Sequence, residues 1–362
     1  MSTDDLSAAL AQVLEPQLGP VEIEHLARLS AGASRETWSF DAVESRDGGP
    51  GTRHRLILQR DRSGAAGEAS AREAELVAHA RSGGVPVPQV VASGRMPNPL
   101  ERSFSITRRL AGESIARRLL RDDEYSAART GLISDFGRAL AAIHRLDPGP
   151  MKGVLPVIDD PVRAIQESLD GLTGRHPVFE LVLRWLADHR PEPSAIRIVH
   201  GDFRLGNMLV DRGGLVAVLD WELAHLGDPI EDLGWLCVRA WRFGERPAVA
   251  GLGDREDLTA VYQSESGVEV SLDELHWWEV YGTLKWGLTT LVMGTMFQPG
   301  VPALLEQGVI ARRVAETEYD LFLLLHPELV ADTTEGPPPP LDHSPHDPPD
   351  AGLLLDTVRA FL

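Results

Sequence analysis

The side chains best suited to chemistry are three polar residues in the middle of the chain, Asp202, Asn207 and Asp220. Asn207 follows Asp202 by five positions, and Asp220 ends a short apolar run. An amide oxygen beside a carboxylate offers hard oxygen ligands, which suit Mg²⁺. A second carboxylate nearby is suited to orient a nucleophilic hydroxyl. Phosphoryl transfer needs these parts, because metal ligands hold the β- and γ-phosphates and a carboxylate positions the acceptor.

Two short strands are predicted between Asn207 and Asp220. The runs Met208–Val210 and Val216–Leu219 flank a turn at residues 211–214, a pattern typical of a hairpin. A hairpin folds the chain back on itself, so we expect Asn207 and Asp220 to be neighbours, with the earlier aspartate on the adjoining loop. Three polar residues in an ordinary hairpin are the simpler interpretation, but apolar strands seldom end in such a convergent set.

Charge and cysteine content restrict the partners. The chain has 35 basic and 54 acidic residues, a formal charge of −19, which repels nucleic acid and anionic membranes and also favours solubility. A single cysteine, Cys237, allows no disulfide framework or zinc cluster. The first residues are acidic and lack an apolar signal core, and the apolar stretch at 287–297 is too short for a bilayer. We expect a cytoplasmic protein of undetermined oligomeric state.

The order of predicted elements indicates an α+β fold of two lobes. After an N-terminal helix in residues 1–20, strand-like runs and one helix over Ser70–Arg81 fill residues 21–110, which we expect to bind nucleotide. Residues 111–335 are mainly helical apart from the hairpin, and we expect them to hold the catalytic and acceptor residues. Residues 336–362 predict a proline-rich linker and a short C-terminal helix.

The segment HGDFRLGN…DWE…GDP…DL resembles the aminoglycoside phosphotransferase and choline kinase family, whose fold is similar to that of protein kinases. It is especially similar to a subgroup that includes the kinase-like domains of some acyl-CoA dehydrogenase fusions, and a weaker resemblance runs from Leu26 to Leu325. The resemblance implies transfer of the γ-phosphoryl group of ATP to a hydroxyl or amine of a small molecule. It implies Asp202 as catalytic base or hydroxyl positioner, and Asn207 and Asp220 as Mg²⁺ ligands.

Four further residues take roles from this resemblance. It implies that Arg204 contacts the γ-phosphate, that His200 holds the catalytic loop, and that Asp232 braces the same loop. Glu222 is either a supporting contact of the site or a solvated side chain.

The nucleotide side is marked less clearly. Gly32 and Ser34 lie in a turn between two predicted strands, where backbone N–H groups are suited to cover phosphates. We expect adenine to bind near the link between the lobes, at Thr107 and Arg108. Whether the nucleotide is ATP or GTP stays open.

The third strand should supply a cation for the α- and β-phosphates, paired with a glutamate on a helix. Glu73 fits the glutamate, although Ser70 and Glu73 also have the form of a capping box. Strand alternation makes Gln59 and Arg60 face opposite ways. We expect Arg60 to supply the charge through a register shift or bulge, because glutamine has none. If Gln59 occupies the basic site, the alternative is a catalytically impaired ATP-binding module.

Other classes fit less well. Asp135-Phe136-Gly137 spells the metal motif of protein kinases, but it lies in a predicted helix and precedes the catalytic loop, which the metal aspartate must follow. A signalling protein kinase is disfavoured because no A-P-E-like segment follows Asp220. A metal-assisted hydrolase is disfavoured because no second histidine cluster accompanies the oxygen ligands.

The residues that could bind the acceptor have two alternative interpretations. Aromatic and basic residues recur at helical spacing beyond the hairpin, which indicates either core packing with solvated charges or a cleft with cationic anchors. These residues are Arg239, Arg242, Trp278, Tyr281 and Lys285. Such a cleft would repel a polycationic aminoglycoside, so we expect a neutral or anionic hydroxylated metabolite, and the subgroup resemblance suggests a hydroxyacyl thioester.

Overall fold

This computed structural model describes residues 2–29, 35–45, 51–61, 68–172, 174–296 and 305–327. The chain divides into two compact units, Met1–Leu321 and Phe322–Leu362. Of the second unit, the described part is 322–327, which contains the end of the last described helix. The predicted linker and C-terminal helix of residues 336–362 lie outside the described residues.

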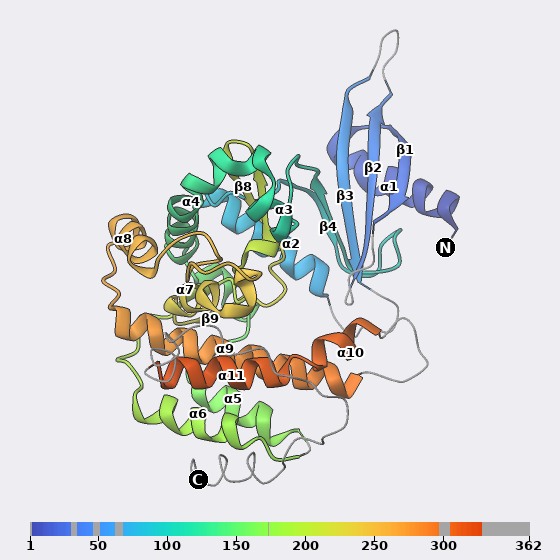
Figure 1. Cartoon of the computed structure of the whole chain (residues 1–362). Coiled ribbons are helices and arrows are strands. Elements are labelled where there is room, and N and C mark those ends of the chain that lie inside the picture. The colour runs from blue at the N-terminus through green and yellow to red at the C-terminus, as the bar shows by residue number, and fades with distance from the viewer. Residues whose placement is uncertain are drawn as a thin grey trace, which may run out of the picture. The chain divides into compact units, whose positions relative to one another are not determined.

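The N-terminal region is built on a five-stranded antiparallel sheet with the strand order β1-β2-β3-β5-β4 (Figure 1). Its strands are β1 Val21–Arg28, β2 Arg35–Glu44, β3 Arg53–Asp61, β4 Val90–Gly94 and β5 Phe104–Arg108. The helix α1, Thr3–Leu18, packs on one face, where its Leu10 and Leu14 share a buried cluster with Leu56 and Leu58 of β3. Helix α2, Ala69–Ser82, contacts β3, β4 and β5, and its bounds are close to those of the predicted helix.

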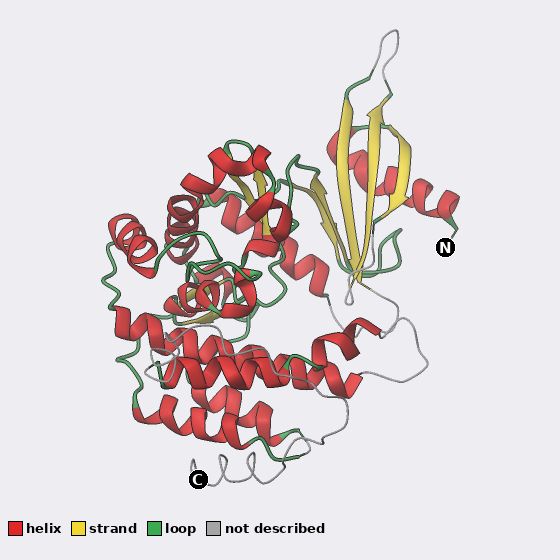
Figure 2. Cartoon of the chain, viewed as in Figure 1, coloured by secondary structure: helices red, strands yellow, loops and turns green. Residues whose placement is uncertain are grey.

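The C-terminal region is mainly helical (Figure 2). Its α-helices are α3 Ala116–Arg121, α4 Ser126–His144, α5 Pro161–Asp170, α6 Pro177–Asp188, α7 Ile230–Cys237, α8 Arg255–Ser266, α9 Leu272–Met296, α10 Leu305–Ala311 and α11 Val314–Leu325. Short 3₁₀ turns are η1 Asp123–Tyr125, η2 Gly149–Met151, η3 Leu205–Asn207 and η4 Arg239–Arg242. The Asp135-Phe136-Gly137 triplet lies inside α4, as predicted. Across the described ranges, every helix is too short or too polar to span a membrane.

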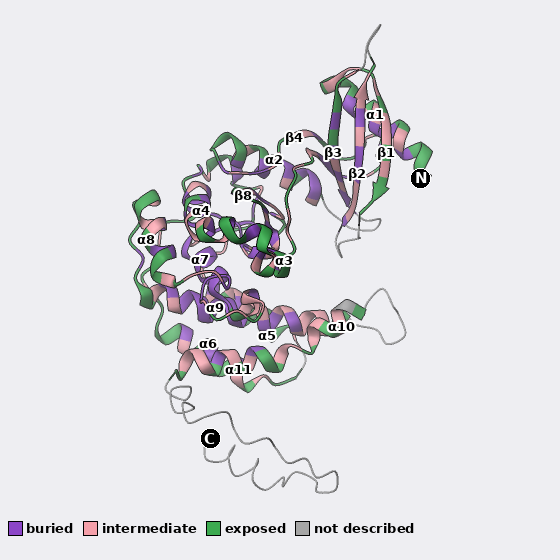
Figure 3. Cartoon of the chain, turned by 45° about the horizontal axis from the view of Figure 1, so that its top comes forward, coloured by how far each residue is buried: buried purple, intermediate pink, exposed green. Residues whose placement is uncertain are grey.

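Helix α7 is the centre of this region, and every one of its residues is buried (Figure 3). It packs on α9 at Gly234, where an added Cβ would come within 2.5 Å of the Trp278 backbone. Glycine therefore permits the close approach of α7 to α9. The same helix contacts the loop that carries Asp202.

Two small antiparallel pairs position that loop. The first pairs β6, Arg197–Val199, with β9, His225–Gly227, and the second is the predicted hairpin, β7 Met208–Asp211 with β8 Gly214–Val218. The hairpin is joined to the chain that follows β5, because Glu113 and Val210 exchange backbone hydrogen bonds of 2.8 and 2.9 Å. This bridge attaches the hairpin to the segment that leaves the N-terminal sheet.

Candidate active site

The loop after β6 carries Asp202 and is held in place by a buried carboxylate on α7. Asp232 accepts hydrogen bonds from the backbone N–H groups of His200 at 2.8 Å and Gly201 at 2.9 Å, and it contacts His144 Nε2 at 3.2 Å. Burial alone would raise the pKa of Asp232, but the hydrogen bond and charge of His144 hold that pKa below its usual value. The ionised carboxylate fixes the start of the loop.

The His200 ring joins this loop to the end of the hairpin. Its Nε2–H donates to the Leu219 carbonyl at 3.1 Å, and its Nδ1 accepts from the Asp202 backbone N–H at 3.2 Å. Both contacts are those of a neutral imidazole with the proton on Nε2. Burial lowers the pKa of His200, which favours the same neutral form.

The Asp202 carboxylate is oriented by three side chains. Arg204 Nε donates to Oδ1 at 2.9 Å and to Oδ2 at 3.1 Å, Asn207 Nδ2 donates to Oδ2 at 2.6 Å, and Trp235 Nε1 donates to Oδ1 at 2.9 Å. The Arg204 guanidinium also lies 4.8 Å above the centre of the Trp241 ring. The carboxylate is thus fixed in direction before any substrate arrives.

The sequence did not mark Trp235 as a contact of this aspartate. The signal that indicates it is helical spacing, because Trp235 follows Asp232 by three residues and so lies on the same face of α7.

Asn207 and Asp220 meet at the open end of the hairpin, as the hairpin geometry predicts. The Leu219 N–H donates to the Asn207 carbonyl at 2.8 Å, and Asp220 follows with a left-handed φ of 62°. Asn207 Nδ2 donates to Asp202, with 3.0 Å to its carbonyl and 2.6 Å to Oδ2, which leaves the amide oxygen as the atom that could hold a metal.

The charges around Asp220 suit a divalent cation. Burial raises the pKa of this carboxyl, Glu222 and Asp202 raise it further by repulsion, and Arg35 and Arg204 lower it. The described residues contain no group of three or more His, Cys, Asp or Glu side chains that would hold a metal unaided. One carboxylate and one amide oxygen instead fit Mg²⁺, which keeps several waters and binds substrate phosphates.

On the nucleotide side, Glu73 of α2 is paired with a different arginine from the one predicted. Its Oε2 forms an ion pair with Arg35 at the start of β2, and its Oε1 accepts from the Trp221 backbone N–H at 3.1 Å. Glu73 therefore makes an ion pair rather than a capping box, and the Ser70 hydroxyl donates to Asp61 at 2.5 Å.

The register shift expected for Arg60 is absent. The pairing of β3 with β2 and β5 runs without interruption, so Arg60 faces the α1 side with Leu56 and Leu58. There its Nε donates to Glu36 at 2.7 Å, away from Glu73.

The other residues predicted to bind nucleotide form two groups. Gly32 and Ser34 lie outside the described residues. Thr107 and Arg108 lie at the end of β5, whose backbone pairs with β3 on one side and β4 on the other. Arg108 directs its side chain to His54, with 2.7 Å between Nη1 and Nδ1.

The five predicted acceptor residues are not brought together. Arg239 is exposed and lies 3.5 Å from Asp320, while Arg242 is bound to the buried Glu279 at 2.7 Å. Trp278 and Tyr281 are buried and pack against Trp277, which is the core-packing alternative.

Lys285, the fifth of these residues, contacts the loop that carries Asp202. Its Nζ donates to the Gly201 carbonyl at 3.1 Å and to Glu231 at 2.7 Å, and it lies 5.0 Å from the centre of the Trp235 ring.

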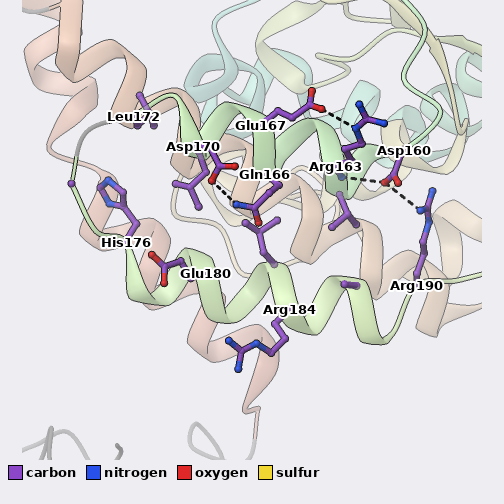
Figure 4. A pocket seen from close by; sticks show the side chains of 15 residues that line it. Asp160, Arg163, Gln166, Glu167, Asp170, Leu172, His176, Glu180, Arg184 and Arg190 are labelled. Carbon is purple, nitrogen blue, oxygen red and sulfur yellow. Dashed lines mark hydrogen bonds and ion pairs between the residues drawn. The ribbon is translucent and has the colours of Figure 1, made fainter.

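A separate groove of about 880 Å³ lies between α5 and α6 (Figure 4). Two pairs of its charged side chains form ion pairs, Arg163 with Glu167 at 2.8 Å and Arg190 with Asp160 at 3.2 Å. It shares no residue with the loop or the hairpin, and its chemistry is that of a solvated surface.

Comparison with known proteins identifies the family. The model of the phosphotransferase enzyme family matches residues 25–267, which span the sheet, the loop and the hairpin. The chain belongs to this family. Among solved structures, a Ralstonia eutropha protein assigned to the aminoglycoside phosphotransferases is 21% identical, with a TM-score of 0.64 over 88% of this chain and 98% of that one.

Further phosphotransferases share the fold. The aminoglycoside phosphotransferase APH(2")-IIIa, solved with GDP and kanamycin, is 16% identical, with a TM-score of 0.60 over 86% of this chain and 97% of that one. A macrolide 2'-phosphotransferase of Brachybacterium faecium is 18% identical, with a TM-score of 0.55 over 89% and 98%. The fold is therefore the protein-kinase-like, two-lobed fold predicted from the sequence.

Curated relatives match over shorter stretches. Acyl-CoA dehydrogenase family member 10 of Mus musculus is 36% identical over 86 residues, and member 11 of the same species is 26% identical over 184 residues. These stretches are 23% and 44% of this chain but only 8% and 23% of the relatives, so the chain corresponds to a minor part of their length.

Proposed function

We propose that this protein transfers the γ-phosphoryl group of ATP to a hydroxyl group of a small molecule. The observation that carries the proposal is the convergence of Asp202, Asn207 and Asp220, in which the Asn207 amide donates to Asp202 and keeps its oxygen for a metal. A positioned carboxylate beside oxygen ligands is the arrangement that phosphoryl transfer requires.

In the proposed reaction Asp202 orients the acceptor hydroxyl and takes its proton as the acceptor oxygen bonds to the γ-phosphorus. The bond from that phosphorus to the β,γ-bridging oxygen breaks, and ADP leaves. Arg204, held on the Asp202 carboxylate by its Nε, keeps its other N–H groups for the transferred phosphoryl oxygens. Asn207 and Asp220 would hold Mg²⁺, which neutralises charge on the β- and γ-phosphates when bound.

The same proposal assigns adenine to the end of β5, near Thr107 and Arg108, and the phosphate-covering turn to Gly32 and Ser34. His200 and Asp232 hold the loop without touching substrate. The proposed setting for the whole reaction is the cytoplasm, and neither nucleic acid nor a membrane takes part.

For the acceptor we propose a neutral or anionic hydroxylated metabolite, with a hydroxyacyl thioester as one member of the class. The support is local, because Arg204 binds Asp202, Lys285 donates to the carbonyl of the neighbouring Gly201, and the buried Trp235 and Trp241 rings pack beside these cations. A polycationic acceptor would be repelled by these two cations.

ADP release measured with hydroxylated metabolites, hydroxyacyl thioesters and aminoglycosides tests the proposal. We expect acceptor-dependent ADP release with a neutral or anionic compound, which disappears in Asp202→Asn. Phosphorylation of kanamycin-type compounds at kcat/KM on the order of 10⁴ M⁻¹s⁻¹ would overturn the acceptor class. Tight Mg·ATP binding without ADP release for any acceptor would favour the impaired ATP-binding module.

A further inference from the structure

Arg35 is a buried cation. A structural role alone does not explain the groups that surround it. Its side chain is 8% exposed, and it lies between two carboxylates, paired with Glu73 through Nη1 and 3.7 Å from Glu222 through Nη2. Its Nε is buried and has no hydrogen-bond partner among the described residues. A buried donor without an acceptor is costly, so the site is suited to an additional anionic group.

The strand register puts Arg35 on the same face of the sheet as Gln59. Thr37 of β2 lies opposite Gln59, and Arg35 lies two residues earlier on the same strand, opposite Asp61. A diagonal neighbour of this kind is about 7–8 Å away, within reach of a long side chain. Arg60 belongs to the other face, with α1.

Glu73 connects this cation to the metal-binding end of the hairpin. One of its oxygens pairs with Arg35, and the other accepts from the backbone N–H of Trp221, the residue directly after Asp220. A single carboxylate therefore separates the guanidinium from the chain that carries the metal aspartate. In sequence, Arg35 also follows directly on Gly32 and Ser34, which are predicted to cover phosphates.

We propose that Arg35, on the second strand, binds the α- and β-phosphates of the nucleotide in place of a basic residue at Gln59. This rests on the proposed phosphotransferase function and deepens it. The guanidinium keeps Glu73 as its partner and directs Nε to a phosphate oxygen, a charge-assisted hydrogen bond. Gln59 is then compatible with activity, because the required charge comes from the neighbouring strand.

Paired variants test the role of the Arg35 charge without leaving the Glu73 carboxylate buried and unpaired. Glu73→Gln is compared with Arg35→Gln/Glu73→Gln. Residue 73 is then neutral in both proteins, which differ only at Arg35. The matched control is Glu36→Gln against Arg60→Gln/Glu36→Gln, an arginine–glutamate pair on the other face of the sheet. Each protein is titrated with Mg·ATP by calorimetry and with adenosine by NMR.

Loss of Arg35 should weaken Mg·ATP binding about 10- to 100-fold and leave adenosine binding unchanged, since adenosine has no phosphate. Loss of Arg60 should change neither. Unchanged Mg·ATP binding without Arg35, an equal loss for both ligands, or an equal loss in the Arg60 pair would overturn the proposal.

If the variants do not fold, a measurement on the wild-type protein tests the same proposal. The Arg35 Nε–H resonance, assigned through bonds from the Arg35 backbone of the wild-type protein, should shift on addition of Mg·ATP and stay in place with adenosine. If Mg·ATP binds and the resonance does not shift, the proposed role of Arg35 is overturned and the proposed function is not. Absence of any Mg·ATP binding to the wild-type protein overturns the proposed function together with it.

Discussion

At the scale of single residues, the proposed role of Asp202 depends on the orientation of its carboxylate. Three donors set its direction, so Asp202→Asn removes the charge and the proton acceptor while it keeps the shape of the side chain. We expect turnover to fall roughly 10²-fold or more, with Mg·ATP affinity near that of the wild type, because a positioning base acts mainly in the transition state. Single-turnover kinetics and calorimetry measure the two effects. Equal turnover in the variant would remove Asp202 from the mechanism.

We expect Trp235 to act on the proposed reaction through Asp202. Trp235→Phe keeps an aromatic ring in the buried cluster with Trp241 and removes the 2.9 Å hydrogen bond to Oδ1. We expect kcat to fall about tenfold, since a hydrogen bond to a charged group contributes about 1.5–3 kcal/mol, with KM for ATP unchanged. Trp241→Phe is the matched control, because the Trp241 indole N–H has no partner among the described residues. Equal losses of kcat in the two variants would assign Trp235 to packing alone.

At the scale of elements, the hairpin β7–β8 positions the two proposed metal ligands. Asp220→Ala should abolish the Mg²⁺ dependence of nucleotide binding, and Asn207→Ala should weaken it less, because a carboxylate brings a full charge to the metal and an amide only a dipole. Calorimetric titration of ATP over a range of Mg²⁺ concentrations measures both. A metal dependence that survives in Asp220→Ala would argue against this site.

The same elements explain which parts of the site the sequence predicted. Asp202, Asn207 and Asp220 lie within one stretch of 19 residues, so local turn and strand patterns were enough to bring them together. The Arg35–Glu73 pair joins residues 38 positions apart. Its prediction needs the register of β2 against β3 and knowledge of which face α1 covers, both long-range properties. Strand alternation alone did indicate that Gln59 and Arg60 face opposite ways, and the uninterrupted register upheld it.

The aromatic residues of α9 fit the core-packing alternative. Trp278 and Tyr281 have the helical spacing that a cleft wall and a core share, and both are buried and pack against Trp277. Lys285, on the same helix, differs because Glu231 and the Gly201 carbonyl hold its charge beside the loop.

At the scale of the whole molecule, a buried chain of charges connects α9, α7 and β9 beneath the catalytic loop. Glu231 accepts from Lys285 at 2.7 Å and from His225 at 3.1 Å, and both it and the histidine are almost fully buried. Burial alone would raise the pKa of Glu231, but the charges of Lys285 and His225 bring it to about 2. Burial alone would lower the pKa of His225, but the charge and hydrogen bond of Glu231 raise it above 6.5.

These two shifts predict how stability depends on pH. The stabilisation from protonated His225 is complete below its unfolded pKa of about 6.5 and is lost as the pH rises through the higher folded value. The stabilisation from ionised Glu231 is present above about 4.5 and is lost as the pH falls toward 2. The pair therefore contributes most between about pH 4.5 and 6.5.

His225→Gln isolates the histidine, because glutamine keeps a polar side chain and Glu231 retains Lys285. We expect the free energy of unfolding to fall by about 1–3 kcal/mol near pH 5.5, with the difference from the wild type shrinking toward pH 8.5 as the wild-type histidine loses its proton. Denaturant unfolding across this pH range measures it, and His189→Gln, at an exposed histidine, is the control. A difference that stays constant or grows with pH would mean that His225 is neutral in the fold, and that Lys285 alone compensates the buried charge of Glu231.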